Sequence, residues 1–119
     1  MFVVPNKTLG TIEDTFHVRV SIQVSEGCHY SIYDLTLGQT GADAPIFEPD
    51  TETVGPGVSI PFTFSLRAVS PGTVTFGAWA YGERYCGDYF NWRYVGGASM
   101  PVTILQYLPR VYIPVIWRE

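Results

Sequence analysis

Hydrophobic residues recur at every second position through most of this chain. Segment 16–24 places them at its even positions, with polar residues between. Segments 58–67 and 73–82 repeat the alternation, which is typical of strands that bury one face. Because helical periodicity is missing almost everywhere, the pattern predicts an all-β fold.

Two of these segments depart from simple alternation. In segment 28–37 the hydrophobic phase shifts by one residue at Ile32 and Tyr33, which predicts a bulge or a change of buried face. Segment 58–67 contains Pro61, which has no amide hydrogen for a ladder hydrogen bond. We therefore expect that strand to lie at a sheet edge or to carry a bulge.

Turn-forming residues divide the rest of the chain. Segment 38–57 holds most of them, around the apolar pair Ile46 and Phe47, and we expect loops flanking one short edge strand. The last two predicted strands, 90–95 and 100–105, are separated by two glycines.

The strand pattern as a whole predicts an antiparallel β-sandwich of immunoglobulin-like form. About seven short strands, with turn signals at roughly ten-residue spacing, fit two packed sheets with Greek-key connections. Val3 to Pro5 would form an N-terminal edge strand, its proline suited to a sheet margin. We expect residues 1–105 to form the sandwich and residues 106–119 to form a hydrophobic C-terminal tail.

The charge of the chain argues against nucleic acid as a partner, and its hydropathy argues against a membrane-spanning segment. The net charge is −4, and the seven basic residues never form a run. Nucleic acid is therefore not expected, because neutralising phosphates requires a concentrated basic patch. Prolines interrupt the longest apolar stretches, so no membrane-spanning segment is expected.

The two cysteines, Cys28 and Cys86, are expected to lie in loops at the same end of the sandwich. A disulfide between them would close a loop of roughly 59 residues and stabilise the fold by about 4 kcal/mol. Such a bridge fits an oxidising compartment and hence an extracellular or cell-surface location. Two unrelated buried thiols are the alternative.

A metal site formed by the cysteines and His29 is the rival interpretation. Structural zinc takes four ligands in tight pairs, and the other histidine, His17, lies on the outward face of a distant strand. We therefore predict no metal ligand and no cofactor.

Segment 82–94, GERYCGDYFNWRY, is rich in aromatic residues and is expected to form a long hairpin loop. Tyr85, Tyr89, Trp92 and Tyr94 would form an aromatic binding patch if they reach solvent. Aromatic side chains on a rigid support stack on sugars or anchor a protein partner at low entropic cost. Ordinary packing, helped by the strand propensity of aromatic residues, is the alternative.

The C-terminal tail has an apolar face on its odd positions. Its predicted partner-binding residues are Val111, Ile113, Val115 and Trp117. Two prolines exclude the tail from the centre of a sheet, yet an exposed apolar ribbon is prone to aggregate. We expect the tail to dock on its own domain or to add a strand to a neighbouring subunit.

The segment SPGTVTF at Ser70 to Phe76, with the strand order and the small-residue turns, resembles bacterial immunoglobulin-like modules of cell-surface and secreted proteins. The resemblance covers about Val3 to Leu105. It implies a non-catalytic role as a spacer, an adhesin or an assembly subunit, and it carries over no functional residues. The tail from Tyr107 is similar to the Y-L-P-type terminal segments of secreted bacterial surface proteins.

These observations predict a non-enzymatic extracellular subunit of a bacterial surface assembly, linked to its neighbours through the C-terminal strand. Two histidines and dispersed carboxylates offer no combination of nucleophile, base and oxyanion site, so no catalytic residue is predicted. One alternative is a carbohydrate-binding module that uses the aromatic residues 85–94, and another is a virion decoration protein. The expected partners are other subunits, a second copy of the chain or a glycan.

Overall fold

The computed structural model describes residues 1–41, 45–49, 51–87 and 89–107, with the backbone alone at 89–92. Within these ranges the chain forms ten strands and no helix, so the predicted all-β fold is confirmed. The strands are β1 (Phe2–Pro5), β2 (Leu9–Thr11), β3 (Thr15–Ser21), β4 (Cys28–Thr40), β5 (Phe47–Glu48), β6 (Glu52–Val54), β7 (Phe62–Ala68), β8 (Gly72–Cys86), β9 (Tyr89–Ala98) and β10 (Val102–Leu105).

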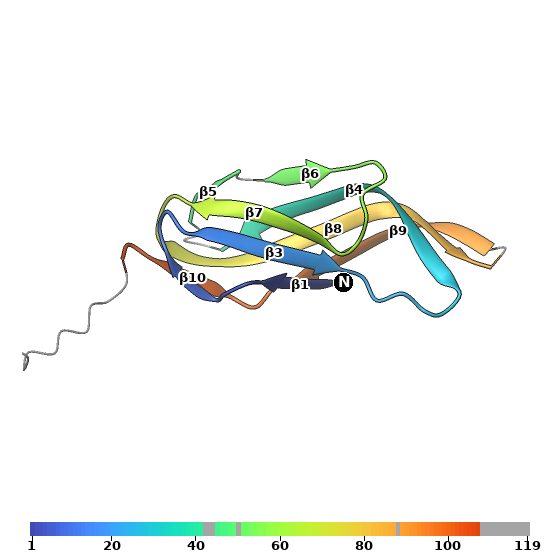
Figure 1. Cartoon of the computed structure of the whole chain (residues 1–119), viewed down its shortest axis with the longest axis horizontal. Coiled ribbons are helices and arrows are strands. Elements are labelled where there is room, and N and C mark those ends of the chain that lie inside the picture. Colours follow the sequence, from blue (N-terminus) through green and yellow to red (C-terminus); the bar gives the residue numbers. More distant parts are fainter. Residues whose placement is uncertain (42–44, 50, 88, 108–119) are drawn as a thin grey trace, which may run out of the picture.

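The strands form two sheets that pack face to face as a sandwich (Figure 1). The small sheet has the order β1-β3-β7-β5, and all of its pairs are antiparallel. Its edge strand β1 contains Val3 to Pro5, which confirms the predicted N-terminal edge strand.

The large sheet has the order β2-β10-β8-β4-β6, and β9 pairs with β8. One flank of β8 is shared, because β10 pairs with residues 72–74 and β9 pairs with residues 77–86. The other flank pairs with β4 from Thr75 to Cys86. The sheet is mixed, since β2 and β10 run parallel.

The core lies between the sheets and follows the predicted alternation. Strands β3, β7 and β8 contribute every second residue to it, and the largest fully buried side chains are Phe16, Phe47, Phe64, Phe76, Leu35, Leu37, Leu66 and Ile104. The ring of Phe47 lies edge-on to Phe16, at 6.1 Å, and 5.3 Å from Phe76. The two-residue strand β5 is thus tied to both sheets by one aromatic side chain.

The irregularity predicted at Ile32 and Tyr33 is present as a register shift in the pairing of β4 with β8. Ile32 pairs with Gly82 and Asp34 with Tyr81, which leaves Tyr33 as the extra residue. Because of this bulge, Ile32 and Leu35 are both buried although three positions separate them.

Three predicted boundaries were wrong. The glycine pair at 96–97 is not a turn but lies inside β9. Glycine is needed there because a Cβ at Gly97 would lie 2.5 Å from the carbonyl oxygen of Met1.

Pro61 precedes β7 rather than interrupting it, because a residue without an amide hydrogen readily ends a ladder. Segment 38–57 completes β4 and then supplies two short strands, β5 and β6, instead of one.

Segment 82–94, predicted as a loop, instead continues the strands β8 and β9. Register pairing extends to Cys86 and Tyr89, and the connection uses Gly87 with φ +66°. A two-residue hairpin connection requires such left-handed conformations, which glycine adopts without steric cost. Figure 1 shows this hairpin projecting past the ends of β1 and β3, at the end of the molecule opposite the end of β10. We call this projection, with the first residues of β4, the tip.

Candidate functional site

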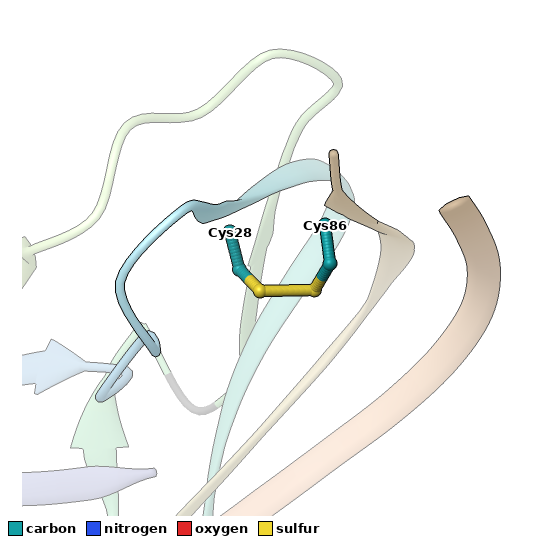
Figure 2. The surroundings of a disulfide bond; sticks show 2 residues. All are labelled: Cys28 and Cys86. Atoms are coloured by element: carbon teal, nitrogen blue, oxygen red, sulfur yellow. A yellow bond between two sulfur atoms is a disulfide. The ribbon is translucent and has the colours of Figure 1, made fainter. Parts of the chain in front are cut away.

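A disulfide joins Cys28 and Cys86 at the tip (Figure 2). The residues are directly opposite each other on β4 and β8, and their Cα atoms are 4.1 Å apart. The predicted bridge is therefore confirmed, but its expected setting in loops was wrong, because both residues lie in neighbouring strands of one sheet. Both sulfurs are bonded to each other, so neither is free to bind a metal.

The outer face of the large sheet, turned away from the core, carries a row of aromatic side chains. Tyr81 of β8 pairs with Tyr94 of β9, and their rings stack with centroids 4.5 Å apart. Tyr33, displaced by the bulge in β4, lies 6.2 Å from Tyr81 on the other flank. Three neighbouring strands thus place their tyrosines side by side.

This row continues in both directions along β8. Toward the tip, the rings of His29 and Tyr85 stack 5.0 Å apart and nearly parallel. Toward the body, Trp79 adds an indole that remains 49% exposed, while Tyr94 is 77% exposed. We call the set Trp79, Tyr81, Tyr94, Tyr33, Tyr85 and His29 the aromatic face. Contiguous exposed surface of this kind is uncommon on monomeric proteins outside interaction sites.

Gly38 of β4 makes room for the indole on the sheet. A Cβ built at Gly38 would lie 3.5 Å from Cη2 of Trp79 and 3.7 Å from its Cζ3. The ring therefore extends across the neighbouring strand next to a position without a side chain. An alanine Cβ would fit at this ordinary contact distance, whereas a larger side chain at position 38 would compete with the indole for the same space.

Glu83 places one carboxylate among the rings. The hydroxyl of Tyr33 donates a hydrogen bond to its Oε1, and the hydroxyl of Tyr85 donates to the same oxygen over 2.9 Å. Both bonds favour the protonated phenol. They raise the pKa of Tyr33 to about 12 and also raise the pKa of Tyr85. The carboxylate thus fixes two aromatic rings and offers acceptor oxygens on the same face.

Two of the four predicted patch residues, Tyr85 and Tyr94, lie on the aromatic face. The backbone register pairs Trp92 with Glu83 and Tyr89 with Cys86, but the side chains of Trp92 and Tyr89 are outside the described part of the structure.

The prediction missed the contributions of Trp79, Tyr81 and Tyr33. A signal for the first two was present, because alternation places Trp79 and Tyr81 opposite the core positions of their strand. No local signal indicated that Tyr33 and Tyr94 lie on the two sides of Tyr81.

The predicted partner-binding residues of the tail, Val111, Ile113, Val115 and Trp117, lie outside the described residues. In the part that is described, no group of three or more histidine, cysteine or acidic side chains is placed to hold a metal ion. That part also lacks any helix with the length and hydropathy needed to cross a membrane.

No protein-family model matches the chain, and no curated protein or solved structure is significantly similar to it.

Proposed function

We propose that this chain is a non-enzymatic, extracellular binding module that holds a neutral polysaccharide on its aromatic face. The observation that carries the proposal is the exposure of Trp79 and Tyr94 within a continuous row of rings on one side of a sheet. Aromatic rings present apolar faces that pack on the C–H faces of sugars, and their few rotatable bonds keep the entropic cost of binding low.

The charge of the aromatic face favours neutral ligands. Among the described residues, its acidic side chains are Glu83 and the exposed Asp34, which pairs with Tyr81 in register. Carboxylates repel anionic polymers and accept hydrogen bonds from sugar hydroxyls. The net charge of −4 on the whole chain also repels anionic polymers.

Three further arguments complete the proposal. The disulfide favours an oxidising compartment and therefore a location outside the cell or on its surface. The immunoglobulin-like relationship, which rests on sequence resemblance, favours a non-catalytic module. A catalytic role for either thiol is disfavoured by their mutual bond, since the thiolate is the nucleophile.

Binding to insoluble cellulose and chitin, and to soluble neutral glucans and mannans in affinity gels, tests the proposal. We expect retention by a neutral polymer, no retention by an anionic one, and a loss of affinity of roughly tenfold or more in Trp79→Ala and in Tyr94→Ala, equivalent to about 1.4 kcal/mol each. Gly38→Leu should weaken binding too, because its side chain would displace the indole.

The matched control is Tyr107→Ala. Tyr107 is as exposed as Tyr94 but follows β10, at the opposite end of the molecule from the tip. Its removal should leave binding unchanged. No retention by any neutral polymer, or equal retention of the wild type and Trp79→Ala, would contradict the proposal.

A further inference from the structure

A groove of about 740 Å³ lies at the tip, between the first half of β4 and two connecting segments. Its apolar side chains come from the residues after β3, from β4 itself and from the residues before β7. They are Ile22, Val24, Tyr30, Ile32, Val58 and Ile60.

The groove exists because the small sheet is shorter than the large one. Strand β3 ends at Ser21 and β7 begins at Phe62, whereas β4 and β8 continue to Cys28 and Cys86. At the tip, the large sheet is therefore bordered by connecting segments. Along the rest of its length it is covered by the strands of the small sheet. Val24, on the groove wall, remains 40% exposed.

The groove lies beside an edge of β4 that is open at Tyr30. In the described residues, β6 pairs with β4 only from Leu35 to Leu37. The Cα separation of 4.1 Å identifies Cys28 and Cys86 as a close pair, whose backbone groups point away from each other. Tyr30 lies two residues further along β4, so its backbone has the same orientation as that of Cys28. Its N–H and C=O therefore point away from β8, toward the free edge.

The neighbouring carbonyl on this edge confirms the direction. The carbonyl oxygen of Ile32 accepts a hydrogen bond from the N–H of Gly57 over 2.8 Å, and the N–H of Cys28 donates to the carbonyl oxygen of Ser25 over 3.0 Å, so the open part of the edge is centred on Tyr30. An apolar groove next to outward-pointing backbone groups is the combination that accepts an added strand, since the backbone supplies affinity and the groove receives alternate side chains.

We propose that segment 111–117 of a second copy of this chain fills the groove as an added strand. The segment places Val111, Ile113, Val115 and Trp117 on one face of an extended chain, which matches an apolar groove. The groove shares His29 and Tyr85 with the aromatic face, but Trp79 and Tyr94, on which the polysaccharide proposal rests, do not line it.

Distance rules out the same copy as the source of the segment. Strand β10 pairs Ile104 with Gly72 at the start of β8, whereas the groove borders Tyr85, thirteen positions along that strand. At the rise of an extended strand this separation is roughly 40 Å. Residues 106–113 span at most about 28 Å when fully extended, so Val111 and Ile113 do not reach the groove of their own copy, and segment 111–117 cannot fill that groove as a strand.

The resulting contact joins unlike surfaces, the groove of one copy and the C-terminal segment of the next. Such heterologous contacts produce open chains of subunits unless the rotation between copies closes a ring. The protein would therefore assemble head to tail, with Trp79 and Tyr94 of each copy outside the contact.

Sedimentation of three full-length proteins over a range of concentrations tests this assembly. The wild type should form concentration-dependent oligomers. Val24→Glu, which places a charge on the groove wall, and Ile113→Asp, which places one in the segment, should each remain monomeric. An equimolar mixture of the two variants should form a 1:1 dimer and grow no further, since only one intact groove and one intact segment are present.

Met100→Glu is the matched control. Met100 is 71% exposed but is not part of the groove, so this variant should assemble as the wild type does. A synthetic peptide of residues 108–119 supplies a measurement on the unaltered protein, because it should occupy the grooves and dissociate wild-type oligomers. A monomeric wild type, a mixture that stays monomeric, or oligomers that resist the peptide would overturn the proposal.

Discussion

Cys28 and Cys86 occupy directly opposite positions on neighbouring strands, and their disulfide joins the ends of β4 and β8 at the tip. The bond links residues 58 positions apart in the sequence. It therefore closes a long loop in the unfolded chain as well as securing two adjacent strand ends in the folded one.

We expect the double variant Cys28→Ser, Cys86→Ser to lower the free energy of unfolding by about 4 kcal/mol, because the unfolded chain regains the entropy of the open loop. Urea denaturation of the oxidised wild type and of the variant measures the difference. Wild type treated with a reductant is the control and should lose a similar amount. A loss below about 1 kcal/mol would show that the loop constraint is not a main source of stability.

Gly82 marks a close approach of β8 to β4. A Cβ there would lie 2.1 Å from the carbonyl oxygen of Ser31 and 3.0 Å from the Cα of Ile32, and neither is the end of a flexible side chain. We expect Gly82→Ala to separate the strands locally and to lower the free energy of unfolding by about 1–3 kcal/mol.

Gly77→Ala is the control for this change, because it also replaces a glycine of β8. Its Cβ would meet only the carbonyl oxygen of Gly97, at an ordinary 3.9 Å. Its stability should equal or exceed that of the wild type, since alanine loses less backbone entropy on folding. Equal losses in the two variants would contradict the argument.

The phenol of Tyr33 should titrate well above an ordinary tyrosine. Its hydrogen bond to Glu83 favours the protonated form and raises its pKa from 10.0 to about 12. The stabilisation from this bond is therefore fully present below pH 10.0 and is lost as the pH rises through about 12.

Ultraviolet absorbance during an alkaline titration follows this ionisation. Replacing Glu83 with glutamine should shift one or two phenols of the wild-type curve back toward the ordinary range, since Tyr85 donates to the same carboxylate. Tyr94→Phe, which leaves the carboxylate in place, should retain the late-titrating phenols. Identical curves for the wild type and Glu83→Gln would show that the carboxylate does not set these pKa values.

Local sequence pattern predicted the elements of the fold better than it predicted their ends. Segment 82–94 contains glycines and charges that favour a loop, yet it pairs continuously as the ends of β8 and β9. Its aromatic residues favour strands when a neighbour is available to pack against, and that neighbour is supplied by distant sequence. The same cause extends β4 through Gly38 and places Gly97 inside β9.

Predicting the aromatic face required knowledge of strand neighbours. The alternation of segment 73–82 separates Trp79 and Tyr81 from the core positions, so two of the six members of the face were readable from one segment. Tyr85 comes from the end of the same strand, and the remaining three members come from β4 and β9, on the two flanks of β8. The bulge at Tyr33 was predicted. The hydrogen bond that Tyr33 forms with Glu83 as a result was not.

By itself, the sequence determined that this chain is all β, which side of each long strand is buried, and where β4 is irregular. These properties follow from a period of two, because adjacent residues of a strand face opposite sides and only one side is apolar. Tertiary structure alone decided that β8 lies between β4 and β9, that the cysteines meet across one sheet and that the small sheet ends before the tip. Strand partners are chosen by hydrogen bonding and burial summed over segments far apart in the chain, and no local periodicity encodes that choice.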